Sequence, residues 1–447
     1  MSQTSPLSLI CATETTALAT VLSKPHRHWA EANGFSGQSG RLLALPGSNG
    51  ALEGYAFGLG GEDRPKLVLG LAGAALDAGE YLLAGDFGDP TLAALGFRLG
   101  AYRFDRYRKS KTPPTLVLPE GADEPELRRL AEAAFLARDL VNTPANDLGP
   151  EQFDAEIRAF AGRHKMAVHA VVGDELLQQN FPMIHAVGRA GPSAPRLLDL
   201  SWGRKSDPKI TLVGKGVTFD TGGLDIKPSS SMLLMKKDMG GAANVLGLAH
   251  AIMDARLKVR LRVLIPIVEN SISATSFRPG DILLSRSGQT VEIGNTDAEG
   301  RLILADALTL ADEESPELIL DMATLTGAAR TALGPELPPL YSTDDALARA
   351  LMAAGLASDD PLWQMPLWAP YQAMLNSKIA DVNHVSSGAF AGSITAALFL
   401  KRFVKNARAW VHLDIFAWAP EARAGRPFGG TDQGIRAAYG VLKQRYS

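Results

Sequence analysis

The chain has 447 residues, and its 45 Lys and Arg against 48 Asp and Glu leave a formal charge of −3, without the basic excess typical of a nucleic-acid-binding protein. A hydrophobic content of 46% and a charged content of 21% are typical of a globular protein with an ample core, which excludes disordered, fibrous and coiled-coil chains. The single cysteine, Cys11, allows no internal disulfide and no cysteine-based metal site, so any metal must be bound by oxygen or nitrogen.

Residues 1–23 lack the basic start and the sustained apolar stretch of a signal peptide. No uninterrupted apolar segment elsewhere is long enough to cross a bilayer. We therefore expect a cytoplasmic protein with no membrane partner and no nucleic-acid partner.

The chain is expected to divide into two domains joined by a helix. Residues 1–122 alternate short apolar runs, such as Leu67–Leu71, with Gly-rich turns and Ala/Leu-rich stretches, a pattern typical of a small α/β domain. Residues 123–145 are predicted to form the connecting helix, because Asp123 is a suitable N-cap and apolar residues then recur at roughly helical spacing. Residues 146–447 form the larger predicted domain.

The larger domain alternates predicted strands with predicted helices. The strand candidates are apolar runs: Ile210–Val213, Val259–Val268, Glu317–Met322 and Trp410–Ile415. The helix candidates between them are Ala242–Ala255, Leu302–Ala311 and Ser393–Val404. This alternation predicts an α/β fold with a mostly parallel central sheet covered by helices on both faces, in which functional groups lie at the carboxyl ends of the strands.

A glycine-rich segment follows the first of these strands. The string Val213–Gly223 carries Lys215 and Asp220 among four glycines, and Lys227 comes shortly after it. Glycines suit a loop that wraps tightly round a ligand. The phosphate-binding spacing G-x-x-x-x-G-K-[ST] is absent and no G-x-G-x-x-G opens a helix, so nucleotide binding is weakly supported. Taken alone, the segment is best interpreted as a strand-to-helix turn with solvated lysines.

Two further segments add carboxylates. Asp238 follows a pair of lysines, and the string Asn295–Leu302 carries Asp297 and Glu299 between a strand-like run and a helical one. Thr296 and Glu299 also fit a helix capping box, but that interpretation leaves Asp297 unexplained. In extended backbone, Asp297 and Glu299 would point to the same side of the chain because they are two residues apart.

Carboxylates gathered from separate strand ends repel one another unless a cation compensates their charge. Hard oxygen ligands suit Mg²⁺ or Mn²⁺, and Zn²⁺ also accepts carboxylate and nitrogen. Two metals a few Å apart would clamp both sides of a hydrolytic displacement and bridge a hydroxide. A cation beside Lys215 would also depress its pKa enough for the neutral amine to coordinate.

Several nearby residues have simpler interpretations. Lys236 and Lys237 are expected to be solvated surface charges. His412, within a strand-like run, is expected to be a core histidine with its hydrogen bonds satisfied. Three methionines are compatible with ordinary core positions: Met232, Met235 and Met239.

Six strings in the larger part of the chain together resemble the leucyl aminopeptidase family, also called cytosol aminopeptidases. They are Val213–Gly223, Ile226–Pro228, Lys237–Met239, Asn295–Leu302, Ala323–Gly327 and His412–Ile415, and Ala137–Asn146 is similar to the family as well. The resemblance covers about residues 100–447, while the first hundred residues show little to match. It implies a dinuclear metallo-exopeptidase that hydrolyses the N-terminal residue from peptides, with residues 146–447 as its catalytic domain.

The resemblance implies a role for each matching residue at the metals. Asp220 and Glu299 would bridge two divalent ions. Lys215 and Asp238 would complete one metal site, and Asp297 the other. The expected metals are Mn²⁺ or Zn²⁺, with Mg²⁺ or Co²⁺ as further candidates, and family members assemble as homohexamers.

Two further residues would act on the substrate. Lys227 would polarise the scissile carbonyl and stabilise the tetrahedral intermediate, a role that suits its positive charge. Arg301 would hold a bicarbonate that acts as general base, which agrees with an arginine near a helix N-terminus. The metal-site and catalytic positions are all present, which favours an active enzyme.

The expected substrate pocket is lined by Met235, Thr324, Leu325, Gly327 and Phe416, with Leu325 offering backbone groups to the substrate. Phe416 departs from the family pattern, because many relatives have His-Leu-Asp-Ile followed by Ala-Gly. If its ring points into the pocket, we expect an altered preference, for smaller or flatter N-terminal residues than leucine.

Other classes of function fit the sequence less well. A non-catalytic relative that keeps the fold would not need an intact set of acidic ligands, and a DNA-binding relative would carry a dense basic stripe, which this chain lacks. A dinuclear phosphoesterase would share the metal chemistry but normally uses histidine ligands, and none of the eight histidines matches a ligand position.

Overall fold

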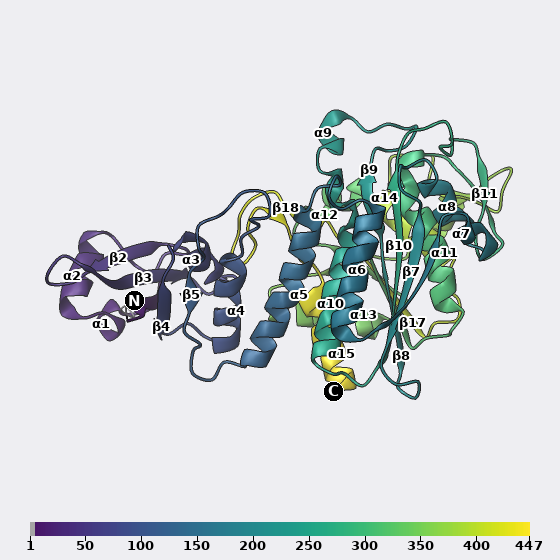
Figure 1. Ribbon diagram of the computed structural model, residues 1–447. Coiled ribbons are helices and arrows are strands. Elements are labelled where there is room, and N and C mark those ends of the chain that lie inside the picture. Colours follow the sequence, from purple (N-terminus) through teal and green to yellow (C-terminus); the bar gives the residue numbers. More distant parts are fainter. Residues whose placement is uncertain (1–4) are drawn as a thin grey trace. The chain divides into compact units, whose positions relative to one another are not determined.

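The computed structural model describes residues 5–447, which form two compact units (Figure 1). The first unit comprises the chain up to Phe135 together with Ala357–Asp359 and Ala419–Gly429. The second comprises Leu136–Leu356, Asp360–Trp418 and Gly430–Ser447. The expected boundaries at residues 122 and 145 stay a prediction. Among the helices of residues 5–447, none is both long and apolar enough to span a bilayer.

The first unit is built on a five-stranded sheet in the order β2-β3-β1-β4-β5. Its strands are β1 (Leu7–Thr13), β2 (Leu42–Pro46), β3 (Leu52–Gly60), β4 (Glu80–Gly85) and β5 (Thr115–Leu116). Its helices are α1 (Leu18–Val21), α2 (Lys24–Ala32), α3 (Gly70–Ala75) and α4 (Pro90–Gly100). The α/β character expected for this region is confirmed.

Glycines let α3 and α4 of the first unit pack closely. A Cβ on Gly100 would lie 1.8 Å from the carbonyl oxygen of Gly70, and one on Gly73 would lie 2.1 Å from that of Phe97. No side chain fits at these distances, so the glycines are required by close backbone approach. Side chains of β1, β3 and α4, including Leu9, form the buried core beneath these helices.

The second unit contains a nine-stranded sheet in the order β15-β14-β17-β13-β8-β10-β7-β6, with β9 paired to β10. Its strands are β6 (Ala167–Val172), β7 (Arg196–Trp202), β8 (Lys209–Gly214), β9 (Gly216–Asp220), β10 (Arg260–Asn270), β13 (Leu318–Ala323), β14 (Pro339–Ser342), β15 (Trp363–Gln364) and β17 (Ala409–Asp414). The four predicted strands correspond to β8, β10, β13 and β17, which pair in parallel at the centre. The strands β6, β7 and β14 pair antiparallel with their neighbours nearer the centre.

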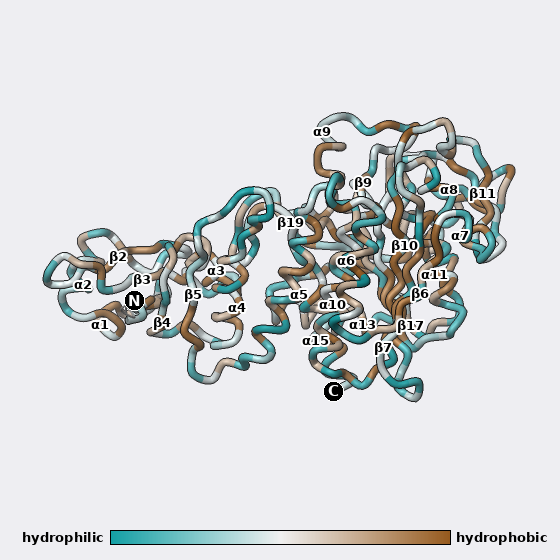
Figure 2. The backbone as a smooth tube through the Cα atoms, in the orientation of Figure 1, coloured by the Kyte–Doolittle hydropathy of each residue, from teal (hydrophilic) through white to brown (hydrophobic). Residues whose placement is uncertain are grey.

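Helices cover the sheet of the second unit on two sides (Figure 1). Its helices are α5 (Glu124–Asn142, shared with the first unit), α6 (Pro150–His164), α7 (Glu175–Gln178), α8 (Pro182–Gly188), α9 (Ser229–Met232), α10 (Gly240–Asp254), α11 (Glu299–Asp312), α12 (Gly327–Leu333), α13 (Asp345–Ala357), α14 (Gly392–Lys401) and α15 (Ile435–Tyr446). The predicted helices correspond to α5, α10, α11 and α14. The central strands are hydrophobic along most of their length (Figure 2), because helices bury both faces.

Short elements complete the second unit. They are the 3₁₀ helices η1 (Met235–Met239), η2 (Thr296–Ala298) and η3 (Ala369–Leu375), and the strands β11 (Ile282–Leu284), β12 (Thr290–Glu292), β16 (Val382–Asn383), β18 (Trp418–Ala419) and β19 (Gly429–Gly430). Both η1 and η2 follow glycine-rich or polar loops beyond the carboxyl ends of the central strands. Asp238 lies in η1 and Asp297 lies in η2. The chain passes directly from η2 into α11, whose first residue is Glu299.

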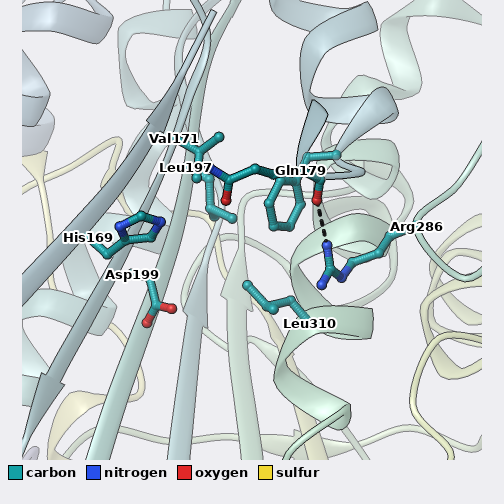
Figure 3. A pocket seen from close by; sticks show the side chains of 8 residues that line it. His169, Val171, Gln179, Leu197, Asp199, Arg286 and Leu310 are labelled. Atoms are coloured by element: carbon teal, nitrogen blue, oxygen red, sulfur yellow. Dashed lines mark hydrogen bonds between the residues drawn. The ribbon is translucent and has the colours of Figure 1, made fainter. Parts of the chain in front are cut away.

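A separate groove lies on the edge strand β6 and its neighbour β7 and encloses a cavity of about 120 Å³ (Figure 3). Its charged groups are already paired. Arg286 donates a hydrogen bond of 2.9 Å to the Gln179 carbonyl and pairs with Glu313, and Asp199 accepts two hydrogen bonds from Arg262. None of the site residues expected from the sequence lines this groove.

His412 is confirmed as a buried core histidine. Its Nδ1 lies 2.5 Å from Asp321 Oδ1, and Trp410 Nε1 donates a hydrogen bond of 2.8 Å to the other carboxylate oxygen. The imidazole stacks on the Trp410 ring with an interplanar angle of 10°. Burial opposes the imidazolium, but the Asp321 carboxylate outweighs it and raises the pKa of His412.

His412→Phe is expected to destabilise the protein by about 3–5 kcal/mol, because Asp321 is left buried without its cationic partner. A raised folded-state pKa means that the stabilising interaction is complete below the unfolded pKa of histidine and is lost as the pH rises through the folded pKa. The loss measured by urea unfolding should therefore be larger near about pH 6 than near about pH 9. His169→Phe, at an exposed histidine on β6, is the control. Equal destabilisation by His412→Phe at both pH values would contradict the ion pair.

Candidate metal centre

Carboxylates from two separate segments of the chain meet beyond the carboxyl ends of the central strands. Asp220 ends β9, Asp297 lies in η2 and Glu299 is the first residue of α11. One carboxylate oxygen from each of the three lies within 4.8 Å of the others. The expectation that Asp297 and Glu299 sit in extended backbone is wrong, since a 3₁₀ turn passing into a helix brings both carboxylates to the cluster.

Two lysines and a fourth carboxylate join this cluster. Lys215, between β8 and β9, places Nζ 2.8 Å from Asp238 Oδ2 and 3.0 Å from Glu299 Oε1. Lys227 places Nζ 2.8 Å from Asp220 Oδ2 and also pairs with Asp297. The structure therefore brings together every residue that the sequence singled out as a metal ligand, and Lys227 with them.

Like charges held this close perturb one another. Burial, together with the Asp220 carboxylate, raises the pKa of Glu299 to about 8 and that of Asp297 to about 6. Burial opposes the charge on Lys215 and Lys227, but the surrounding carboxylates outweigh it and raise the pKa of both. The two ammonium groups thus supply positive charge where a divalent cation would also be stabilised.

Buried oxygens in the cluster lack hydrogen bonds. Within residues 5–447, Asp238 Oδ2, Asp297 Oδ1 and Glu299 Oε1 accept no hydrogen bond of good geometry, although a lysine ammonium lies within ion-pair distance of each. Oxygen lone pairs buried without directed donors are costly unless a cation uses them. Three Asp, one Glu and an amine form a donor set that suits Mn²⁺, Mg²⁺ or Zn²⁺.

Glycines explain how the chain closes round the cluster. Gly222 has φ +88°, and a Cβ there would lie 2.4 Å from the Asp225 carbonyl oxygen. A Cβ on Gly300 would lie 2.5 Å from Lys215 Cε, so this position must be glycine for the lysine to reach the carboxylates.

The capping-box interpretation of Thr296 is wrong. The N-cap of α11 is Ala298, and Thr296 Oγ1 instead donates a hydrogen bond of 2.7 Å to the Gly222 carbonyl and accepts one of 2.8 Å from the Asp225 amide. Thr296 therefore ties the two ligand-bearing loops together.

Asn270 is a further site residue that was not predicted from the sequence. Its Nδ2 donates a hydrogen bond of 2.8 Å to Asp220 Oδ1 and lies 3.4 Å from Glu299 Oε2. Asn270 is the last residue of β10 and is fully buried. The sequence feature that could have identified Asn270 is a polar residue at the end of an apolar strand. Its side chain orients two of the carboxylates.

Arg301 lies in the first turn of α11 with its side chain buried. Its Nη1 donates a hydrogen bond of 2.7 Å to the His384 carbonyl, and its Nε has no hydrogen-bond partner among residues 5–447. Burial lowers the pKa of Arg301 to about 10. This value is still well above neutral pH, so the guanidinium stays charged. Part of this cation therefore remains available to an anion.

Of the residues expected to line the substrate pocket, Thr324 contacts the cluster directly. Thr324 follows β13, donates a hydrogen bond of 2.8 Å to Asp238 Oδ1 and accepts one of 3.0 Å from Lys215 at its carbonyl oxygen. Gly327 is exposed, and a Cβ there would meet no atom within 4 Å. The Leu325 amide donates to Asp414, so this N–H is already engaged.

Phe416 and Met235 are both partly exposed. Phe416 follows β17, and its amide donates a hydrogen bond of 2.8 Å to Gln433 Oε1. Met235 begins η1, three residues before Asp238. Of the three methionines expected in the core, only Met239 is fully buried.

The expectation that Lys236 and Lys237 are solvated is wrong. Lys236 Nζ donates a hydrogen bond of 2.7 Å to the Asn142 carbonyl and lies 5.5 Å from the centroid of the Trp418 ring. Lys237 is only 5% exposed, and burial lowers its pKa to about 8. No local pattern marks a Lys-Lys pair as buried, because the segments that cover it are distant in the sequence.

Family models match most of the chain. The model described as the cytosol aminopeptidase family, catalytic domain, matches residues 135–439, and that described as the M17 aminopeptidase, N-terminal domain, matches residues 5–119. The second match corrects the expectation that the first hundred residues have little counterpart in the family. That domain carries no short chemical motif, so its similarity lies in the whole domain sequence.

Individual relatives agree with the family models. A probable cytosol aminopeptidase from Roseiflexus castenholzii is 42% identical over 367 residues, which cover 78% of this chain and 75% of that protein. Another, from Caulobacter vibrioides, is 38% identical over 444 residues, which cover 92% of this chain and 89% of that protein.

Solved structures show the same similarity. The crystal structure of a cytosol aminopeptidase from Coxiella burnetii is 44% identical and superposes with a TM-score of 0.94 over 100% of this chain and 99% of that one. The bottromycin maturation enzyme BotP, solved in complex with Mn, is 33% identical, with a TM-score of 0.90 over 99% of this chain and 100% of that one. Because the catalytic-domain match alone spans more than half of the chain, this protein belongs to the cytosol aminopeptidase family and is a peptide hydrolase.

Proposed function

We propose that this protein is a metal-dependent aminopeptidase that removes the N-terminal residue of peptides with two divalent ions per subunit. The observation that carries the proposal is the cluster of buried carboxylate oxygens that lack directed hydrogen bonds beside Lys215. When bound, the ions would lower the pKa of a water between them and polarise the scissile carbonyl. Mn²⁺ and Zn²⁺ are the favoured metals, with Mg²⁺ or Co²⁺ also suited to these ligands.

Each ligand has a proposed place in the centre. Asp220 and Glu299 would hold both ions; Glu299 lies beside Lys215, and Asp220 lies beside Lys227. Lys215 and Asp238 would complete one site, and Asp297 the other. Lys215 would bind as the neutral amine, because a divalent ion replaces the charge that its ammonium now supplies.

Lys227 and Arg301 would both take part in the hydrolysis. Lys227 is not a ligand in the proposal, and its ammonium would stabilise the oxyanion of the tetrahedral intermediate. Arg301 would hold a small anion, with bicarbonate the best candidate for accepting a proton. The unpartnered Nε of Arg301 supports an anion there.

The substrate side chain would lie among Met235, Thr324, Gly327 and Phe416. The hydrogen bond from Thr324 to Asp238 supports a pocket beside the proposed metal ligands, where the residue bearing the free α-amine would bind. The Phe416 ring would narrow the pocket. A preference for smaller or flatter side chains than leucine would follow.

Metal removal tests the proposal directly. We expect a chelator to reduce the hydrolysis of alanyl, leucyl and methionyl chromogenic amides to background, and Mn²⁺ or Zn²⁺ to restore it, because the proposed ions would supply the activated water. Elemental composition should show close to two divalent ions per subunit in the active enzyme. Full activity of a preparation that contains no divalent metal would overturn the proposal. The same amides with a blocked N-terminus are the control, since an exopeptidase needs the free amine.

The remaining expectations are proposals from the family resemblance. We propose a cytoplasmic homohexamer acting on peptide substrates. Sedimentation in the analytical ultracentrifuge distinguishes a hexamer from a monomer.

A further inference from the structure

Lys237 is a buried lysine whose ammonium contacts an aromatic ring. It lies in η1 directly before the proposed ligand Asp238, and it forms no ion pair within residues 5–447. Its ammonium lies over the Phe416 ring, with Nζ 4.7 Å from the ring centroid. A buried ammonium whose nearest defined contact is an aromatic face is costly, because ring contact replaces only part of its hydration.

A second cation approaches the same ring. Arg330, in α12, has its Cζ 5.7 Å from the centroid of the Phe416 ring. Its Nη2 pairs with Asp414, but its Nη1 is buried and has no hydrogen-bond partner in the described part of the chain. Phe416 therefore lies near two cations, and among residues 5–447 the Nη1 of Arg330 is an unused donor.

Asp414 cannot neutralise both cations. Its carboxylate already accepts hydrogen bonds from the amides of Leu325 and Thr326, from Thr326 Oγ1 at 2.6 Å and from Arg330. Two divalent ions would balance the four carboxylates proposed as their ligands. No carboxylate among residues 5–447 is then left within ion-pair distance of Lys237, whose ammonium lies over the Phe416 ring.

The place of this charge is suited to substrate recognition. Thr324 contacts Asp238, the neighbour of Lys237, and Phe416 remains partly exposed. The side chain of an N-terminal residue projects from the carbon between the α-amine and the scissile carbonyl. Since both of these groups must lie at the metals, that side chain must lie within a few Å of them.

We propose that Lys237, assisted by Arg330, binds the side-chain carboxylate of an acidic N-terminal residue, so that the enzyme prefers aspartyl or glutamyl substrates to leucyl ones. This inference rests on the proposed aminopeptidase function and specifies its substrate class. An acidic side chain would pair the buried ammonium, whereas leucine would leave it unpaired and desolvated. The aspartate carboxylate is also planar, whereas the leucine side chain branches tetrahedrally, which agrees with a pocket narrowed by Phe416.

Hydrolysis of aspartyl, glutamyl, asparaginyl and leucyl chromogenic amides by the Mn²⁺-loaded enzyme tests the inference. The asparaginyl amide has nearly the shape of the aspartyl amide without its charge. We expect kcat/KM for the aspartyl amide to exceed that for the asparaginyl and leucyl amides by about 10- to 100-fold, the range expected for a hydrogen bond to a charged group. In Lys237→Met, the aspartyl-to-asparaginyl ratio should fall by a similar factor, mainly through KM.

Lys236→Met is the matched control, because it removes the same charge at the neighbouring position. The Lys236 ammonium donates its hydrogen bond to the Asn142 carbonyl. Its aspartyl-to-asparaginyl ratio should equal that of the wild type. Lys237→Gln provides a second variant of similar length, and thermal unfolding shows whether each variant is folded.

The outcomes separate the two levels of the proposal. A wild type that cleaves leucyl and asparaginyl amides as well as the aspartyl amide overturns the acidic preference and leaves the aminopeptidase intact. A ratio that is the same in wild type and in folded Lys237→Met or Lys237→Gln overturns the role of Lys237. Failure to hydrolyse any free-amine amide with bound Mn²⁺ overturns the proposed function, and the acidic preference with it.

Discussion

Glu299→Ala is expected to lower kcat/KM by about 10³-fold or more and to lose bound divalent metal, while the fold is largely kept. Loss even of groups that orient a metal ligand costs about 10- to 100-fold in metal affinity or activity, so loss of a shared ligand should cost more. Glu299 Oε1 lies 3.0 Å from Lys215 Nζ, and Oε2 lies 3.4 Å from Asn270 Nδ2. The Glu299 carboxylate thus lies next to Lys215, a proposed metal ligand, and to Asn270, which orients the carboxylates.

The fold should tolerate this change. Burial and the neighbouring Asp220 raise the pKa of Glu299 to about 8, which shows that its ionised form is disfavoured where it stands. Removing it leaves α11 with an alanine at its first position, a residue of high helix propensity. Far-ultraviolet circular dichroism and thermal unfolding should therefore change little in the chelated protein.

The measurement combines peptide-amide hydrolysis with the metal content of the purified variant. Glu313→Ala is the control, because it makes the same change at the exposed opposite end of α11. It should retain both metal and turnover. A Glu299→Ala protein that keeps wild-type turnover would refute the ligand assignment.

Lys227→Met is expected to lower kcat by about 10²- to 10³-fold, the cost of removing one oxyanion-stabilising donor. Its ammonium lies 2.8 Å from Asp220 Oδ2, next to the carboxylates that would hold the metals. The backbone amide of Lys227 donates a hydrogen bond of 2.9 Å to the Thr221 carbonyl, which holds the loop independently of the side chain. The loop should therefore survive the substitution.

The two substitutions differ in what happens to the metals. Because Lys227 is proposed to act on the carbonyl and not to coordinate, Lys227→Met should keep its divalent ions, whereas Glu299→Ala should lose them. The deficit should lie mainly in kcat, since the oxyanion forms only in the transition state. Lys227→Arg, which keeps the charge, should recover part of the rate. A rise in KM with unchanged kcat would contradict the proposed role.

Local sequence was enough to predict the central strands of the second unit and the helices between them. The strands β8, β10, β13 and β17 are buried on both faces, so each appears as an apolar run whose meaning does not depend on distant residues. The ligand strings were equally local. Lys215, Asp220 and the segment Asn295–Leu302 could be singled out because a capping box leaves Asp297 unexplained and because the acidic residues recur in several segments that follow strands.

Hydrogen bonds between residues far apart in the sequence could not be predicted from local sequence. Thr296 resembles a capping residue, yet it bonds to Gly222, which lies 74 positions earlier in the chain. Asn270 donates a hydrogen bond to Asp220, which lies 50 positions earlier in the chain, and no periodic pattern in the sequence indicates such a contact. The 3₁₀ geometry of η2 likewise follows from the loop against which it packs.

The sequence by itself determined the α/β fold class, the central strands, the helices beside them and the identity of the acidic cluster. Hydrophobic period, glycine content and charge are properties of short segments, and short segments are what a sequence displays. Only the tertiary structure decided which polar side chains are buried and what faces them. Lys237 shows the reason: its burial depends on Phe416, 179 positions later, and the cost of burying a charge is set by neighbours that only folding brings together.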